Sequence, residues 1–243
     1  DIAALSNGVV SSLGTRAISA ITDAQVTALT SSQVTSLTTS QLNSLTNIDK
    51  IDPSDLAAVS AANFSKLSST QLANLSTAQA NALTVAQVKA LSTTQISQLE
   101  AADVGAFNTA VISSLATNQL VALTTAQASQ ITTAQALALS ASQLSAMEGA
   151  DLAALTTSSQ QALSQSQLAK LSSSQLNAMS GLSSAQSGGG TYSIMSSADI
   201  RGISTSTFSG LSSTQIAGFL PTQASFITTA QIRAMSTSAL LGL

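Results

Sequence analysis

Apolar residues recur along this chain every eight residues. Leu67, Leu75, Leu83 and Leu91 begin a series that ends on Leu243, and a second apolar residue precedes most members by three positions. Between residues 60 and 243, Ser or Thr opens 17 of the 23 octads, and Gln stands fourth in 13 of them. The unit is therefore S/T-x-x-Q-φ-x-x-L, where φ is apolar. The same frame covers residues 6–45, and residues 46–51 interrupt it by being two residues short.

The opening of each octad predicts the start of a helix. Ser or Thr followed three residues later by Gln is a capping box, in which the hydroxyl and the Gln side chain each accept a backbone N–H. The apolar fifth and eighth positions are three residues apart, so they share one helical face. Because the next octad caps again at once, each helix can last only about two turns.

Two other architectures fit the spacing poorly. In one continuous helix, eight residues advance by about 800°, so the apolar stripe would slip by about 80° per octad. A β-solenoid requires apolar positions two or four apart, and Ala and Gln do not favour strands. The prediction is an all-α solenoid of very short capped helices, one per octad, stabilised by stacking of successive coils.

A period of 48 residues is superimposed on the octads. Asp55, Asp103, Asp151 and Asp199 occupy the Gln position at this interval. If one coil holds two, three or six octads, these acids fall on one side of the solenoid. We expect a single solenoid over residues 1–243, with a phase break at 46–51 and an irregular Gly-rich segment at 180–195. The start at an Asp indicates a segment of a longer chain.

These four aspartates are also the candidates for a metal site, although each stands apart from the others in the sequence. Calcium takes six to eight oxygen ligands, usually from several neighbouring carboxylates. Asp also suits the first turn of a helix, where it can replace Gln in capping. We therefore interpret Asp55, Asp103, Asp151 and Asp199 mainly as structural capping residues.

Several apolar or aromatic residues stand where the unit is normally small or polar, or within the Gly-rich segment. Exposed apolar side chains on a weakly charged solenoid favour self-association. The candidates for an assembly interface are Val85, Val121, Leu137, Tyr192, Leu220, Phe226 and Leu241.

Composition excludes several classes of function. The chain has no His and no Cys, and only 7% of its residues are charged. Catalysis near neutral pH therefore lacks its usual proton carrier and thiol nucleophile. Seven basic against ten acidic residues provide no basic stripe for nucleic acid. No apolar stretch is long enough to span a membrane. We expect a non-enzymatic protein without a cofactor.

Residues 78–95, AQANALTVAQVKALSTTQ, resemble the ALTTAQ octapeptide arrays of very large secreted or surface proteins of Gram-negative bacteria. The resemblance extends over nearly the whole chain. It implies an extracellular or cell-surface location and a structural or adhesive role. It carries over no catalytic residues, because the motif has none.

The expected function is a self-assembling extracellular scaffold or filament subunit, or a segment of a long adhesin stalk. The uniform repeats, the low charge and the absence of polar end caps favour it. The alternative is a surface module that presents Ser and Thr rows to ice or polysaccharide. Strictly periodic apolar residues argue against a disordered, glycosylated chain. Glycans on outward hydroxyls of a folded solenoid remain an open alternative.

Overall fold

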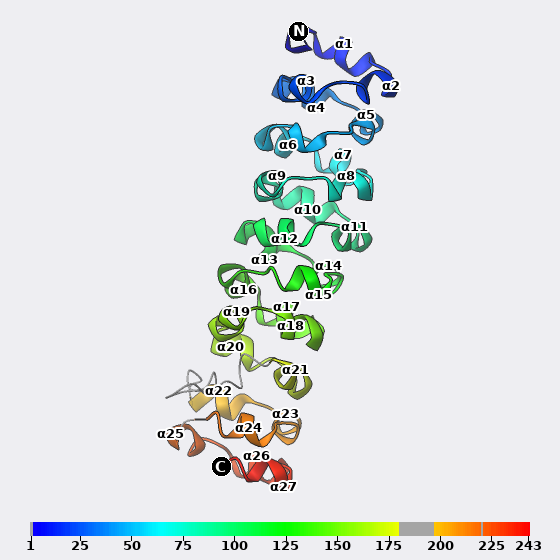
Figure 1. The fold of residues 1–243 in the computed structure, drawn as a ribbon. Coiled ribbons are helices and arrows are strands. Elements are labelled where there is room, and N and C mark those ends of the chain that lie inside the picture. The colour runs from blue at the N-terminus through cyan, green and yellow to red at the C-terminus, as the bar shows by residue number, and fades with distance from the viewer. Residues whose placement is uncertain (1, 180–196, 220) are drawn as a thin grey trace. The chain divides into compact units, whose positions relative to one another are not determined.

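The computed structural model describes residues 2–179, 197–219 and 221–243. Over these residues the chain forms 27 α-helices and two 3₁₀ turns, and no strand. The α-helices are four to six residues long, and successive ones follow the octads of the sequence (Figure 1). The prediction of an all-α solenoid with one short helix per octad is confirmed.

The chain divides into two compact units. The N-terminal unit is Asp1–Leu123 and the C-terminal unit is Thr124–Leu243. The N-terminal unit contains η1 (Ile2–Ala4), α1 (Asn7–Ser12), α2 (Thr15–Ile18), α3 (Asp23–Thr27), α4 (Ser31–Ser36), α5 (Thr39–Ser44), η2 (Ile48–Lys50), α6 (Pro53–Ala58), α7 (Ala61–Phe64), α8 (Ser69–Ala73), α9 (Thr77–Ala82), α10 (Val85–Ala90), α11 (Thr93–Ser97), α12 (Ala101–Ala106), α13 (Thr109–Ser114) and α14 (Thr117–Val121).

The C-terminal unit contains α15 (Thr125–Ala128), α16 (Thr133–Ala138), α17 (Ala141–Ala146), α18 (Gly149–Ala154), α19 (Thr157–Ala162), α20 (Gln165–Leu168), α21 (Ser173–Ala178), α22 (Ser197–Gly202), α23 (Thr205–Ser209), α24 (Ser213–Ile216), α25 (Pro221–Ala224), α26 (Thr229–Ala234) and α27 (Thr237–Leu240).

One coil of the solenoid contains three octads, or 24 residues. In the N-terminal unit α6 packs against α9 and α9 against α12, while α7, α10 and α13 form a second column. In the C-terminal unit α15 packs against α18, α16 against α19 and α17 against α20. Each helix therefore stacks on the helix three octads earlier. This answers the question of coil size, which the sequence left open among two, three and six octads.

The fifth and eighth positions of the octads form the core. Leu72 is fully buried and Leu75 is 6% exposed, and both positions are buried in every octad of the N-terminal unit from Val26 onward. A helix of four to six residues is too short to be stable alone, so this apolar pair is buried only through contact with the neighbouring coils. The inward orientation predicted for this pair is confirmed.

The phase break at residues 46–51 is a shortened octad that still forms one of the three segments of its coil. Its 3₁₀ turn η2 places Ile48 and Ile51 three residues apart, and both are buried like the inner pair of a full octad. Asn47 immediately precedes Ile48 and so occupies the position of the usual Gln. The two missing residues come from the capping half of the unit, and the core half is kept.

The stacking register changes in the C-terminal unit after α21. Helix α21 packs against α23, whose first residue, Thr205, lies 32 residues beyond Ser173 instead of 24. The column of α18 and α21 thus continues into α23 and not into α22, the helix that contains Asp199. The side chain of Asp199 lies outside the described residues, as do Tyr192 and Leu220.

Candidate functional site

The capping box is formed as predicted in nearly all described octads that have Ser or Thr first and Gln fourth, and the octad of residues 84–91 illustrates it. The Thr84 hydroxyl accepts the Gln87 N–H at 3.2 Å, and the Gln87 Oε1 accepts the Thr84 N–H at 3.0 Å. Both groups would otherwise be unpaired at the start of α10. Among the described residues the same reciprocal pair recurs at twelve further octads with Ser or Thr in first place, for example at α4, α5, α9, α11, α17 and α20.

The Gln side chain has a second role that links adjacent coils. The Gln87 Nε2 donates to the carbonyl oxygens of Leu56 and Val59, both at 2.9 Å. These carbonyls lie 31 and 28 residues earlier, at the end of α6, where a helix leaves acceptors without intrahelical partners. Gln87 is 1% exposed, so the contact is shielded from water. We call this Nε2-to-carbonyl contact the inter-coil tether.

The inter-coil tether repeats with the same register in both units. It joins acceptors 28 to 31 residues earlier at Gln33, Gln41, Gln79, Gln95, Gln119, Gln167, Gln175 and Gln231. At Gln71 the span includes the shortened segment 46–51, and the acceptors are the carbonyls of Asn43 and Leu45, 28 and 26 residues earlier. Sequence reasoning did not predict it. The available signal was the preference for Gln over Glu, since either completes a capping box but only the amide also has N–H donors.

Two of the periodic aspartates accept a hydroxyl from the coil before. Asp151 Oδ1 accepts a hydrogen bond from the Thr125 hydroxyl at 2.9 Å, and Asp55 Oδ1 accepts one from the Ser31 hydroxyl. Ser31 and Thr125 are each the second residue of the octad three places earlier. A carboxylate cannot donate to the carbonyls that a Gln would tether. In these octads it instead accepts a hydrogen bond from a hydroxyl of the preceding coil.

Asp103 lacks that solution. It is 1% exposed, and its Oδ2 is buried without a hydrogen-bond partner. Burial, together with the smaller effect of the neighbouring Glu100 charge, raises the pKa of Asp103 to about 6. Thr77 stands at the position equivalent to Thr125, but the bond found at Asp151 is not repeated on Oδ2 of Asp103. A buried ionised carboxylate without a donor is unfavourable.

Two shorter side chains in the Gln position still reach the tether's acceptor. Ser159 Oγ donates to the Ile131 carbonyl at 3.0 Å, and Asn47 Nδ2 donates to the Ile21 carbonyl at 3.4 Å. Both acceptors are eighth residues of the octad four places earlier. A side chain as short as Asp can therefore span this gap when it carries a proton donor.

Gln160 is a polar residue in a core position. It occupies the fifth place of its octad and is 1% exposed. Its Nε2 donates to the carbonyls of Leu152 and Leu155 at 3.2 and 2.9 Å, at the end of the preceding helix α18. The tether to α18 would normally come from the fourth residue of the octad at 180–187, which is Ser183 in the sequence. Gln160 instead donates hydrogen bonds to these carbonyls from within the same coil.

The described candidates for an assembly interface are partly exposed and scattered along the chain: Val85, Val121 and Leu137 lie on α10, α14 and α16, and Phe226 and Leu241 lie in the turns after α25 and α27. Val85 is 37% exposed, Val121 38%, Leu137 50% and Leu241 85%. Phe226 is half-buried, and the Arg201 guanidinium lies 5.9 Å from its ring centroid. Their exposure agrees with the sequence analysis, and their role in assembly stays a prediction.

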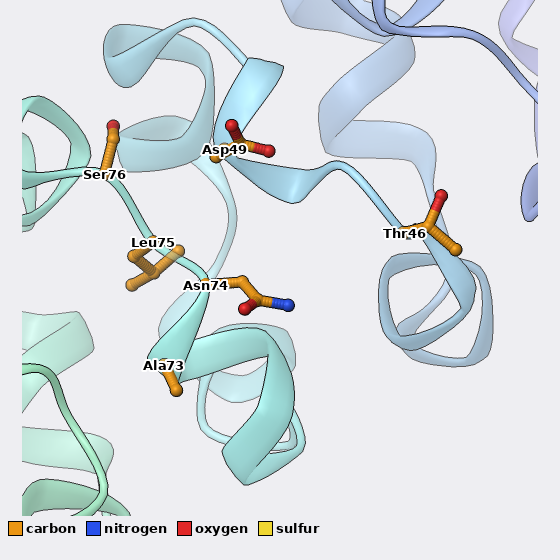
Figure 2. A pocket seen from close by; sticks show the side chains of 6 residues that line it. All are labelled: Thr46, Asp49, Ala73, Asn74, Leu75 and Ser76. Carbon is orange, nitrogen blue, oxygen red and sulfur yellow. The ribbon is translucent and has the colours of Figure 1, made fainter.

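An open hollow lies beside the phase break. It has a volume of about 430 Å³ and is lined by Thr46, Asp49, Ala73, Asn74, Leu75 and Ser76 (Figure 2). Its single carboxylate, Asp49, is ion-paired with Lys50 at 2.5 Å. Across the described residues there is no group of three or more His, Cys, Asp or Glu that could hold a metal ion. None of the described helices is long and apolar enough to cross a membrane.

Stacked two-turn helices with a shared core define the class of this protein as an α-helical repeat solenoid. The repeat itself is of a known type. The family model of the ALTTAQ repeat matches residues 48–85 and 96–133. The two matches begin 48 residues apart, which is the period of the aspartates, so these two stretches are tandem copies of the ALTTAQ repeat. No match was found among curated proteins.

Proposed function

We propose that this chain is a structural, non-catalytic protein that acts as a self-associating filament or scaffold subunit, or as a segment of a long adhesin stalk. The inter-coil tether carries the proposal. In the tethered octads other than that of Gln71, the Gln caps its own helix and holds the preceding coil, while the two apolar positions fill the core. The recurring chemistry of the repeat thus serves stacking, and it can be extended by adding coils.

Exposed apolar side chains support lateral self-association. Val85, Val121 and Leu137 stand at second or sixth positions, where the repeat is usually small or polar, and each is more than a third exposed. With only 7% charged residues, little electrostatic repulsion opposes contact between copies. The resemblance to surface-protein arrays supports an extracellular or cell-surface location.

Binding of ice or polysaccharide has less support. The first-position hydroxyls that could form a regular row are used in capping, as Thr84 is at 3.2 Å from the Gln87 nitrogen. Glycans would have to attach to hydroxyls at other positions.

Light scattering and electron microscopy of the purified chain over a range of concentrations test the proposal. We expect concentration-dependent assemblies, and we expect the triple variant V85S/V121S/L137S to shift them to higher concentration with unchanged helicity. A variant with three exposed Ala-to-Ser changes serves as the control for altered surface hydroxyls. A strictly monomeric protein at high concentration would exclude self-assembly and leave the stalk segment.

A further inference from the structure

Asp103 occupies the position from which a Gln would tether the preceding coil, a contact that depends on a proton donor and is separate from the proposed structural role. By the register of the other tethers, Asp103 stands opposite the carbonyls of Leu72 and Leu75, which are 31 and 28 residues earlier. Gln87 uses the same register to donate to Leu56 and Val59. An ionised Asp103 has no proton to donate, whereas a neutral carboxyl group has one.

The length of the side chain permits this donation. Asn47 has the same number of side-chain atoms as Asp and donates across the gap to the Ile21 carbonyl at 3.4 Å. Ser159 is shorter and donates to the Ile131 carbonyl at 3.0 Å. The buried Oδ2 of Asp103, which has no partner, is available for the equivalent bond to Leu75.

We propose that Asp103 is a proton-dependent inter-coil tether. In its neutral form the carboxyl O–H donates to the Leu75 carbonyl and holds the coil of α12 to the coil of α8 and α9. Ionisation removes the donor and places a negative charge beside a carbonyl oxygen, which loosens this one coil contact. Asp55 and Asp151 are not part of the switch, because hydroxyls of Ser31 and Thr125 donate to them.

Few charged residues surround Asp103, and none of those described is a cation that would stabilise its ionised form. Helix α9, which packs against α12, has no charged residue, and neither do the octads 68–75, 76–83, 92–99 and 108–115. Glu100, at the start of the same octad, is the one charged group that acts on Asp103, and it disfavours ionisation. No Lys or Arg stands near enough to stabilise the carboxylate by an ion pair among the described residues.

The sign of the pH effect follows from the direction of the shift. The folded chain holds the pKa of Asp103 at about 6, above the ordinary value of 3.8. Folding therefore favours the protonated form, and its contribution is fully present below the ordinary value. It is lost as the pH rises through about 6. The coil contact at Asp103 is thus tighter in mildly acidic than in neutral solution.

Amide hydrogen exchange of the full chain at about pH 4.5 and about pH 7, corrected for intrinsic rates, tests the proposal. We expect amides of residues 72–76 and 101–107 to exchange about tenfold or more faster at the higher pH. The variant D103N supplies a permanent donor, as Asn47 does, and should abolish this difference. The variant D151N removes a carboxylate that already has a donor, and should leave the difference in place.

Two outcomes would overturn the proposal. One is equal protection of residues 72–76 at both pH values in the unmodified chain. The other is a pH difference that persists unchanged in D103N. If D103N does not fold, the side-chain carboxyl carbon of Asp103 can be titrated by NMR in the unmodified chain. A midpoint near the ordinary value of 3.8 would then contradict the proposal, and one near 6 would support it.

Discussion

Two corners of the N-terminal unit bury the same inner pair of apolar residues and differ in the side chain that the next coil places opposite them. The end of α6 receives the Gln87 amide on the carbonyls of Leu56 and Val59, at 2.9 Å each. The end of α8 stands opposite Asp103, whose Oδ2 has no partner. The inner pairs of both corners are buried. The two corners therefore share the core and differ in the residue at the fourth position, which tethers one corner and not the other.

The largest expected effect concerns the part that the two corners share. Leu56→Ala and Leu72→Ala each remove a fully buried side chain, so each should lower the free energy of unfolding by about 2–5 kcal/mol. We expect similar losses at the two corners because the cores are alike. Chemical denaturation followed by circular dichroism measures both. A loss at Leu72 well below that at Leu56 would mean that the α8 corner is loosely packed as well as untethered.

The next effect separates the corners. Gln87→Met keeps the size of the side chain but leaves the Val59 carbonyl and the Thr84 N–H without partners, and leaves the Leu56 carbonyl with the Val59 N–H alone. At about 1–3 kcal/mol for each buried polar group, with partial relaxation, we expect a total loss of about 2–4 kcal/mol.

Gln130→Met is the matched control for the loss of the Gln87 amide. Gln130 is exposed, and its Nε2 donates to Ser129 Oγ at 3.4 Å. A change at a surface position of this kind should stay within about 0.5 kcal/mol. Equal losses for the two variants in denaturation would show that the tether contributes nothing beyond capping and size.

A third change makes Asp151 resemble Asp103. Thr125→Val removes the hydroxyl that donates to Asp151 Oδ1 at 2.9 Å and should cost about 1–3 kcal/mol. Thr93→Val is the control. Like Thr125, Thr93 is the second residue of its octad, but the residue 26 positions later is Gln119 and not an acid. If both variants lose the same stability in thermal unfolding, then the β-branched apolar side chain explains the loss, and the hydrogen bond does not.

The sequence was enough to predict the elements that depend on neighbouring residues. A hydroxyl and a Gln three residues apart make a capping box within one octad, and the inner pair is separated by less than one helical turn. Both predictions needed only the geometry of a helix. The 3₁₀ turn at Ile48–Lys50 also follows from the missing two residues, which leave the inner pair intact.

The contacts between coils could not be predicted in this way. Gln87 meets Leu56 because three octads complete a coil, and this number depends on how the corners pack, which the octad alone does not specify. For the same reason the hydroxyl of Thr125 could not be paired with Asp151 in advance. The aspartates were interpreted as substitutes for Gln in capping, but their partners lie in another coil.

The smallest expected effect tests capping apart from tethering. Ala116 opens the octad of Gln119 without a hydroxyl, yet Gln119 still accepts the Ala116 N–H at 3.1 Å and tethers Val88 and Leu91. Ala116→Ser should therefore add only the bond to the Gln119 N–H and raise the free energy of unfolding by about 0.5–1 kcal/mol. Thr84→Ala should lower it by about the same amount in the octad of Gln87, again with the tether kept. The two changes are reciprocal, so opposite shifts of similar size in denaturation would assign the hydroxyl to capping alone. A loss at Thr84 several times larger than the gain at Ala116 would show that the hydroxyl also positions the Gln for its contact with the coil before.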